Sequence, residues 1–380
     1  MKSMSNSIFP LPMLPLTGEI ETKAVLKKLS TARAALAGLN GIAESIPNER
    51  IIINTLALQE AKDSSAIENI VTTHDELYSS DSQTHQFVSL AAKEVYNYAH
   101  ALLEGYQQVK QSSLLTSNNI IALQALLEEN DAGFRKVPGT VLKNEHTGET
   151  VYMPPQDYDT IVSLMSNLEH FINYPSLSDI DPVIKMAIIH HQFESIHPFY
   201  DGNGRTGRIV NILYLVKEGL LKLPILYLSR FINQNKAAYY NLLQQTRQTG
   251  QWEPWILYIL DAVEQTALQT SDMIRGIKVL MTRHKQKIRT ELPKVYSQDL
   301  INSLFRHPYT KIEFVKTDLN VARKTAARYL DLLCDINLLH KKRLGKENYY
   351  FNDDLISLLV NVGSLKKQEQ DTMTIRTTRG

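Results

Sequence analysis

Apolar residues recur at spacings of three and four along most of this chain, and that period predicts helices. From residue 21 to about 110 the sequence is also rich in Ala, Leu, Lys and Glu, as in ETKAVLKKLSTARAALAGL. At Asp181-Pro182 the pattern is typical of a helix start, an N-cap followed by proline in the first turn. Within and beyond that region, individual helices are predicted over 84–108, 118–129, 158–174, 181–194, 205–218, 233–248 and 254–285.

The helical period is broken over 138–155, PGTVLKNEHTGETVYMPP. Here β-branched residues flank a polar centre, Gly148 lies near the expected turn, and Pro154-Pro155 ends the stretch. This arrangement predicts a β-hairpin.

After about Pro293 the chain changes to short elements. LINSLFRHP and TKIEFVKTDL predict two short helices, and Asn320 is expected to cap a third, VARKTAARYLDLLCDI. LLHKKRLGKENYYF then predicts two strands around Gly345. Three helices followed by a hairpin are the pattern of a winged helix-turn-helix.

These elements predict a mainly α protein: a helical bundle with one β-hairpin, followed by a small winged-helix domain. We expect an extended arm and helical region over 1–110 and a helical core over 111–285. The winged-helix domain is expected over 290–362, and a polar, disordered tail over 363–380.

Composition adds exclusions rather than a function. Of the 380 residues, 43% are apolar and 21% are charged, and the net charge of +1 gives no global indication of nucleic acid or a membrane surface. The single cysteine excludes an internal disulfide and fits a reducing compartment. No apolar run approaches the ~20 residues that cross a bilayer. Pro10, Pro12 and Pro15 interrupt any signal-peptide region, so we expect a cytoplasmic protein.

The stretch HPFYDGNGRTGR, residues 197–208, concentrates groups that suit polyphosphate chemistry. Gly202, Gly204 and Gly207 let the backbone turn and approach a ligand closely. With Asn203 between two of these glycines, backbone N–H groups can form an anion-binding nest at a helix start. Arg205 and Arg208 are three residues apart on that helix and can both reach phosphate oxygens.

Two further residues of this stretch supply a metal ligand and a base. Asp201 offers the hard oxygen that Mg²⁺ prefers, and His197 has the ordinary pKa of a group that accepts a hydroxyl proton near neutral pH. Taken singly, each group has a structural explanation: His197 could be a packed histidine, the two arginines a solvated helix face, and the glycines a plain turn. No single structural need calls for all of them together.

A metal-hydrolase site built from His190, His191, His197 and Asp201 is the competing interpretation. On one helix His190 and His197 would lie ~10 Å apart, whereas helical zinc pairs favour a spacing of four residues. Pro198 also indicates that the helix has ended. We therefore expect His190 and His191 to pack behind the loop.

HPFYDGNGRTGR resembles the Fic-domain signature HxFx(D/E)GN(G/K)RxxR at every defined position. The resemblance implies a Fic-type bundle that transfers AMP from ATP, with Mg²⁺, to a Ser, Thr or Tyr hydroxyl of a target protein. It makes His197 the base and Asp201 the Mg²⁺ ligand. Gly202, Asn203 and Gly204 would hold the α- and β-phosphates, and Arg205 and Arg208 would face the β/γ end.

The donor is indicated by one position. In the related, phosphorylating Doc branch the residue equivalent to Gly204 is lysine, so glycine favours AMP transfer. Other diphosphate-containing donors stay open. So do the choice among Ser, Thr and Tyr, self-modification and a homodimer.

SSAIEN, residues 64–69, resembles the family's inhibitory motif (S/T)xxxE(G/N), with Ser64, Glu68 and Asn69 at its defined positions. Its place ahead of the core resembles the class II arrangement. We expect Glu68 to pair with Arg208 where the γ-phosphate would lie. Alone, the segment would be a plain helix with a solvent-facing glutamate. In some relatives this glutamate supports AMP removal, which the sequence leaves open.

The remaining expectations concern partners. The hairpin at 138–155 lies where the family's target-docking flap is expected, with an inert surface hairpin as the alternative. Tyr239 and Tyr240 resemble a position that lines the adenine pocket, although at least one also fits helix core. DNA binding by the winged-helix domain is the alternative function, through basic residues at Arg323, Lys324, Arg328, Lys341, Lys342, Arg343 and Lys346.

Overall fold

The computed structural model describes residues 11–46, 48–79, 87–143, 147–344 and 347–361, and helices dominate it. The predicted mainly α fold class is confirmed. The chain divides into two compact units, each formed by separate segments of the sequence. The first unit comprises Met1–Ala37, Ala57–Thr72 and Ser89–Thr266; the second comprises Gly38–Leu56, Thr73–Val88 and Ala267–Gly380.

The first unit contains the helices that frame the 197–208 stretch. The helix predicted over 233–248 is preceded by a separate helix, and Asn235 divides the two by donating from its backbone and side-chain nitrogens to Phe231 O. The helices with residues in this unit are α1 (Lys23–Ala43), α2 (Glu49–Ile67), α4 (Leu90–Ser112), α5 (Ser117–Glu128), α6 (Tyr158–Asn173), the 3₁₀ helix η1 (Pro175–Leu177), α7 (Pro182–Ile196), α8 (Asn203–Lys217), α9 (Leu228–Gln234), α10 (Lys236–Thr249) and α11 (Glu253–Glu291).

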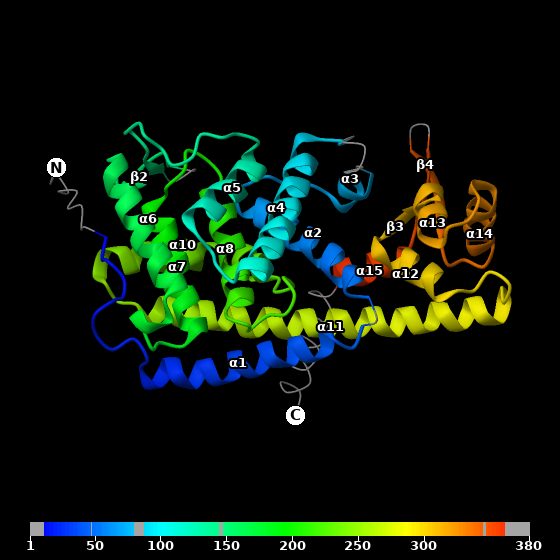
Figure 1. The fold of residues 1–380 in the computed structure, drawn as a ribbon, viewed down its shortest axis with the longest axis horizontal. Coiled ribbons are helices and arrows are strands. Elements are labelled where there is room, and N and C mark those ends of the chain that lie inside the picture. Colours follow the sequence, from blue (N-terminus) through cyan, green and yellow to red (C-terminus); the bar gives the residue numbers. More distant parts are fainter. Residues whose placement is uncertain (1–10, 47, 80–86, 144–146, 345–346, 362–380) are drawn as a thin grey trace, which may run out of the picture. The chain divides into compact units, whose positions relative to one another are not determined.

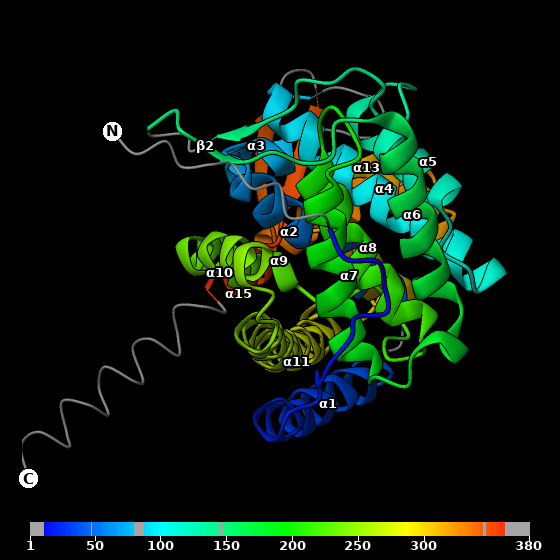
Figure 2. The same cartoon turned by 90° about the vertical axis from the view of Figure 1, so that its left-hand side faces the viewer.

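Helix α7 forms the centre of this unit. All its residues from Val183 to Ile196 are buried, and it packs against α6 and α8. Asp181 accepts a hydrogen bond from Val183 N at 2.8 Å, with Pro182 following it in the first turn, as the sequence predicted. Figure 1 and Figure 2 both show α7 and α8 side by side. The link between these two central helices is the 197–208 stretch, which is therefore held on both sides by packed core.

Helix α4 packs closely against α5 and α8 because Gly105 has no side chain. A Cβ added there would lie 2.6 Å from Leu213 Cδ1 on α8 and 2.9 Å from Leu123 Cδ2 on α5. Contacts of that length do not occur between unstrained carbon atoms. Gly105 thus permits the close approach that brings α4 and α5 beside the start of α8.

The predicted hairpin is present, with shorter strands than the stretch that predicted it. Strand β1 (Leu142–Lys143) pairs antiparallel with β2 (Thr150–Tyr152), and the register shifts within β1. Gly148 has a φ of +71°, which fits its predicted place at the turn. Residues 144–146 lie outside the described residues.

The second unit carries the predicted C-terminal elements. Besides parts of α1, α2 and α11, this unit contains α3 (His74–Ser79), α12 (Gln298–Arg306), β3 (Tyr309–Lys311), α13 (Ile312–Leu319), α14 (Arg323–Asp335), β4 (His340–Leu344), β5 (Glu347–Phe351) and α15 (Asp353–Asn361). The order of the antiparallel sheet is β3-β5-β4. Three helices and a hairpin were predicted here; strand β3 and helix α15 were not.

One prediction in this unit was wrong. Asn320 does not begin the third helix but ends the second, as the C-cap of α13 with a φ of +51°. Asparagine tolerates the left-handed conformation, which makes it suitable for this position. Helix α14 instead begins after Ala322, without a side-chain cap.

Several predictions fall outside the described residues: the tail at 363–380, Gly345 and Lys346. Within the described part of the chain, no helix combines the length and the apolar character that crossing a membrane would require.

Candidate active site

The 197–208 stretch forms the end of α7, a short loop and the start of α8. His197 caps α7 in the left-handed conformation (φ 50°, ψ 60°), and its N–H donates to Phe193 O at 2.9 Å. Gly202, with a φ of 73°, is the N-cap of α8. The imidazole and the helix start are thus held at opposite ends of one tight loop.

Asn203 closes this loop with its side chain. Its Oδ1 accepts from Phe199 N and its Nδ2 donates to Phe199 O, both at 2.8 Å. Both polar atoms of this buried side chain are thus used to close the loop, which fixes the backbone at the start of α8.

The start of α8 has the features of an anion-binding nest. Gly202 provides no side-chain cap, so the first N–H groups of the helix have no partner from that residue. An added Cβ on Gly202 would lie 2.3 Å from Glu128 Oε1, and one on Gly204 would lie 2.4 Å from Glu68 Oε1. Two carboxylates therefore already rest against the backbone that the sequence assigns to phosphates.

Arg208 is buried and bound on one side by the end of α2. Its Nε donates to Ser64 Oγ at 2.7 Å and its Nη2 to Ser64 O at 3.0 Å. Nη2 also donates to Glu68 Oε1 at 2.8 Å. The predicted contact between Glu68 and Arg208 is present.

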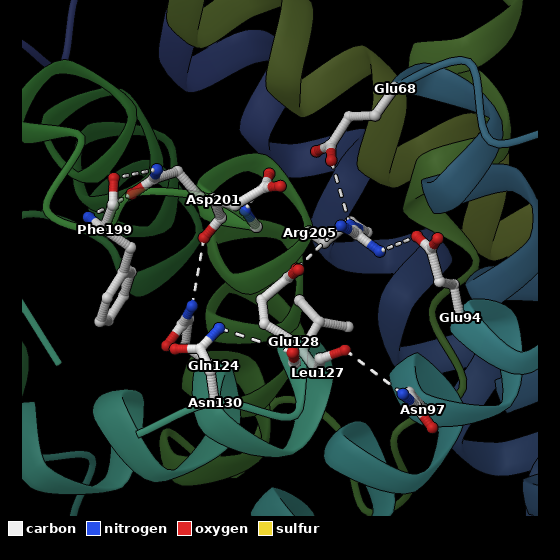
Figure 3. A network of polar contacts seen from close by, with 12 residues as sticks. Glu68, Glu94, Asn97, Gln124, Leu127, Glu128, Asn130, Phe199, Asp201 and Arg205 are labelled. Carbon is white, nitrogen blue, oxygen red and sulfur yellow. Dashed lines mark hydrogen bonds and ion pairs between the residues drawn. The ribbon is translucent and has the colours of Figure 1, made fainter. Parts of the chain in front are cut away.

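Arg205 is held by three carboxylates, as Figure 3 shows. Its Nε donates to Glu68 Oε2 at 3.1 Å, its Nη1 to Glu94 Oε2 at 2.8 Å and its Nη2 to Glu128 Oε1 at 2.8 Å. Glu68 therefore bridges the two arginines, one oxygen to each. Glu94 and Glu128 come from α4 and α5, which the close packing at Gly105 brings to this place.

Glu128 lies in an unusual environment for a carboxylate. Burial raises its pKa to about 7, and Asp201, Glu68 and Glu94 act in the same direction, although Arg205 opposes them. Below pH 7 this group is therefore partly neutral.

The end of α2 turns away from the site after Glu68. Asn69 has a φ of +62°, and its Oδ1 accepts from Lys236 Nζ at 3.1 Å. The three predicted residues of this motif thus divide their contacts: Ser64 and Glu68 bind the arginines of α8, and Asn69 contacts the start of α10.

The His197 ring is kept neutral. Burial, together with the guanidinium groups of Arg247 and Arg135, lowers its pKa to about 3. Its Nδ1 has no hydrogen-bond partner among the described residues. At neutral pH the imidazole is therefore unprotonated, as a proton acceptor must be.

Arg135, which the sequence analysis did not single out, ties this loop to the segment around the hairpin. Its Nε donates to His197 O at 2.9 Å and its backbone N donates to Pro198 O at 2.8 Å. Its Nη2 also donates to Pro155 O, at the end of the 138–155 hairpin. Arg135 is buried, so these bonds are protected from water.

Arg247 was also missed. It donates from Nε to Ser195 Oγ at 2.8 Å and from Nη2 to Glu194 O at 3.0 Å, and it lies over the Tyr152 ring of β2. Neither this arginine nor Arg135 belongs to a sequence pattern, so no signal in the chain pointed to them.

The two tyrosines of the expected adenine position differ. Tyr239 is buried, and its hydroxyl lies 2.9 Å from His190 Nε2, within an aromatic cluster that includes Trp255. Tyr240 is 45% exposed.

Burial lowers the pKa of His190 to about 3, and His191 Nε2 lies 3.1 Å from Leu243 O. Both histidines pack behind the loop as expected.

The donor set fits Mg²⁺ better than zinc. Asp201 is exposed at the head of the nest, and of its two carboxylate oxygens only Oδ1 accepts a hydrogen bond from the described residues, from Gly202 N at 2.7 Å. Among the described residues no group of three or more His, Cys, Asp or Glu side chains could hold a metal ion. Mg²⁺ does not need such a group, since it is commonly bound by one or two carboxylates together with substrate phosphates and water.

The basic residues of the second unit are partly neutralised by their neighbours. Arg323 pairs with Glu313, and Lys341 Nζ lies 2.8 Å from Asp331 Oδ1. These two cations are less available to a DNA phosphate than the sequence suggested.

Three family models match the chain. The Fic/DOC family N-terminal model matches residues 26–107, and the Fic/DOC family model matches 114–215. A model described as "Protein adenylyltransferase SoFic-like, C-terminal domain" matches 280–355. Together these matches extend over most of the sequence and include both motifs described above.

Curated relatives match over a shorter stretch. The chain is 29% identical over 154 residues to "Protein adenylyltransferase Fic" of Drosophila virilis, covering 39% of this chain and 30% of that protein. It is 31% identical over 134 residues to the protein of the same name from Drosophila mojavensis, covering 34% and 25%. The chain thus spans less than a third of the length of these relatives.

Solved structures agree in fold. A Fic family protein from Desulfovibrio desulfuricans has a TM-score of 0.56 at 20% identity, covering 89% of this chain and 97% of that one. Fic-1 from C. elegans has a TM-score of 0.52 at 18% identity, covering 66% and 73%. At these identities the likeness concerns the fold alone.

Proposed function

Because the chain belongs to the Fic/DOC family, we propose that it transfers AMP from ATP to a side-chain hydroxyl of a target protein. The observation that carries this proposal is the start of α8, where an uncapped helix N-terminus and two buried guanidinium groups surround one carboxylate. Backbone N–H groups and arginines in this arrangement suit a polyphosphate. The name shared by the curated relatives supports AMP as the group transferred.

In the proposed reaction His197 accepts the proton of the target hydroxyl. The hydroxyl oxygen then forms a bond to the α-phosphorus, the bond from that phosphorus to the bridging oxygen breaks, and pyrophosphate leaves with the electron pair. A pKa of about 3 makes the free imidazole a weak base. A bound triphosphate would place negative charge near the ring and raise this pKa, because nearby anions favour imidazolium.

We assign the phosphates to the backbone at Gly202, Asn203 and Gly204, and the β/γ end to Arg208 and Arg205. Gly207 lets α8 lie close to α7, since an added Cβ would be 2.8 Å from Glu194 Oε1. Asp201 would hold Mg²⁺, which when bound offsets the charge of the phosphates.

The contacts of Glu68 support a proposal of autoinhibition. Glu68 occupies both arginines with its two oxygens, so a γ-phosphate would have to displace it. A triphosphate that binds out of line because of this obstacle would react about a hundredfold more slowly. We propose that Ser64, Glu68 and Asn69 form an inhibitory segment.

The target is proposed to dock at the 138–155 hairpin. Val151 in β2 is 44% exposed, and a two-stranded sheet leaves strand edges to which an extended segment can pair. Arg135 and Arg247 both connect the hairpin region to the loop of His197. A docked hydroxyl would therefore be positioned relative to the base.

The test is the mass of the protein and of added acceptor proteins after incubation with ATP and Mg²⁺. Glu68→Gly is expected to raise the gain of AMP about a hundredfold over the unchanged chain. His197→Ala in the Glu68→Gly form should abolish it. Glu104→Gly, at an exposed glutamate of α4, is the matched control and should behave like the unchanged chain. A gain of phosphate, or no gain with the Glu68→Gly form, would refute AMP transfer.

A further inference from the structure

Helix α2 presents more than the inhibitory motif to the site. Glu60, Ser64 and Glu68 are four residues apart, so they follow one face of the helix as it approaches α8. Ser64 and Glu68 contact Arg208. Glu60, one turn earlier, is not part of the motif, and its hydrogen bonds are to Tyr98 and Ser229.

Glu60 is a buried carboxylate, only 2% exposed, with partners on two other helices. Tyr98 of α4 donates from its hydroxyl to Oε1 at 3.2 Å. Ser229 of α9 donates from its backbone N to Oε2 at 3.0 Å, and its hydroxyl donates to Oε1. One side chain thus joins the middle of α2 to α4 and α9.

These bonds are stronger than ordinary surface contacts. Burial raises the pKa of Glu60 to about 7, while the Ser229 hydrogen bonds and the charge of Arg208 favour the ionised form. A buried carboxylate that accepts three hydrogen bonds strongly prefers one position, because any displacement leaves it without partners in a dry environment.

The position of Glu68 depends on how α2 is held by contacts of this kind. Glu68 follows the last residue of α2, and its side chain is 25% exposed, so its own surroundings fix it less firmly than Glu60 is fixed. A shift or fraying of the second half of α2 would withdraw Ser64 and Glu68 from Arg208 together. The strength of inhibition therefore depends on how firmly that half of α2 is held.

We propose that Glu60 is a positioning residue for autoinhibition: its bonds to Tyr98 and Ser229 hold α2 so that Glu68 occupies the two arginines. This rests on the proposed function, and it adds a residue outside the inhibitory motif. Glu60 does not contact a nucleotide in this account; it acts through Glu68.

The experiment compares AMP transfer by the unchanged chain and by Glu60→Gln, Glu68→Gly and the double variant. Loss of one charge-assisted interaction shifts a docking equilibrium by about tenfold. Glu60→Gln should therefore raise transfer about tenfold, less than Glu68→Gly. In the double variant, Glu60→Gln should add nothing, because its effect passes through Glu68.

Two further sets of variants separate positioning from general loss of structure. Ser229→Ala and Tyr98→Phe leave Glu60 in place but remove the hydroxyl groups that donate hydrogen bonds to it, so each should raise AMP transfer. Ser65→Ala is the matched control on α2: Ser65 is buried beside Ser64, but its hydroxyl has no partner among the described residues. It should leave the rate unchanged.

Amide hydrogen exchange gives a readout that does not depend on catalysis. Glu60→Gln should speed exchange in residues 60–68 about tenfold, with little change in α7. The proposal is overturned if Glu68→Gly is active while Glu60→Gln leaves both rate and exchange unchanged, or if Glu60→Gln lowers transfer in both backgrounds. If Glu68→Gly itself transfers no AMP, the proposed function fails, and the regulatory role of Glu60 fails with it.

Discussion

Removing Glu68 should leave Arg208 as a buried cation without a hydrogen-bonded carboxylate among the described residues, and this should lower the stability of the protein. Arg208 is 2% exposed, and within the described part of the chain it donates hydrogen bonds to Ser64 Oγ, Ser64 O and Glu68 Oε1. Arg205, in contrast, keeps Glu94 and Glu128 when Glu68 is absent. The Glu68→Gly variant is therefore expected to be less stable than the unchanged chain, because of Arg208 rather than Arg205.

The size of this loss of stability follows from the hydrogen bonds that Arg208 keeps in the variant. Breaking a fully buried ion pair costs about 3 to 5 kcal/mol. Glu68 is partly exposed and Ser64 retains two bonds to Arg208, so we expect about 2 kcal/mol. For a unit as large as the first one, a loss of about 2 kcal/mol corresponds to a fall in Tm of about 4 to 8 °C.

ATP should restore what the variant loses, because its γ-phosphate can replace the carboxylate on Arg208. The assay is thermal unfolding of the unchanged chain and of Glu68→Gly, each alone, with AMP and with ATP, all with Mg²⁺. ATP should stabilise the variant more than it stabilises the unchanged chain, while AMP should stabilise both alike. An unchanged Tm in the variant, or equal stabilisation by AMP and ATP, would refute this account of Arg208.

The remaining predictions concern packing, the hairpin and pH. Gly105→Val should destabilise the protein by about 3 kcal/mol through overpacking against Leu213, measured by denaturant unfolding. Gly38→Val, where nothing lies within 4 Å, should change the stability by less than about 1 kcal/mol, since valine favours a helix slightly more than glycine does. Arg135→Ala should lower transfer to a protein target more than it weakens ATP binding, so an equal effect on both would contradict its role between hairpin and loop. Burial raises the pKa of Glu60 to about 7, so the folded form binds more protons than the unfolded form between pH 4.5 and 7, and stability should fall as pH rises through that window. Glu60→Gln should reduce this slope, and an unchanged slope would show that Glu60 does not titrate in this window.

The contacts that the sequence could predict are those carried by a motif or a local period. The helix start at Asp181-Pro182, the turn at Gly148 and the pair between Glu68 and Arg208 all depend on residues whose types and spacing are recognisable in the chain. Each needs only a local rule or one matched motif. The predictions for these residues required no knowledge of how the helices pack.

The contacts that the sequence could not predict join elements far apart in the chain. Glu94 and Glu128 reach Arg205 from α4 and α5, more than seventy residues away. Their periodicity shows which face of each helix is polar, but not which helix that face meets. The same limit hid the link from Arg135 to His197. Asn320 was misplaced for a different reason, since asparagine favours both the start and the end of a helix.

The inhibition that we propose is a competition between one internal carboxylate and a phosphate for the same two cations. The ion pairs of Glu68 do not set its strength alone, because a γ-phosphate offers Arg208 and Arg205 bonds of the same kind. The advantage of Glu68 is its high effective concentration, which lasts only while the second half of α2 stays docked. The bonds from Glu60 to Tyr98 and Ser229 contribute to that docking from a place that a nucleotide does not reach. A partner or condition that loosens α2 there would activate the site without competing for the arginines, so inhibition could be tuned independently of nucleotide affinity.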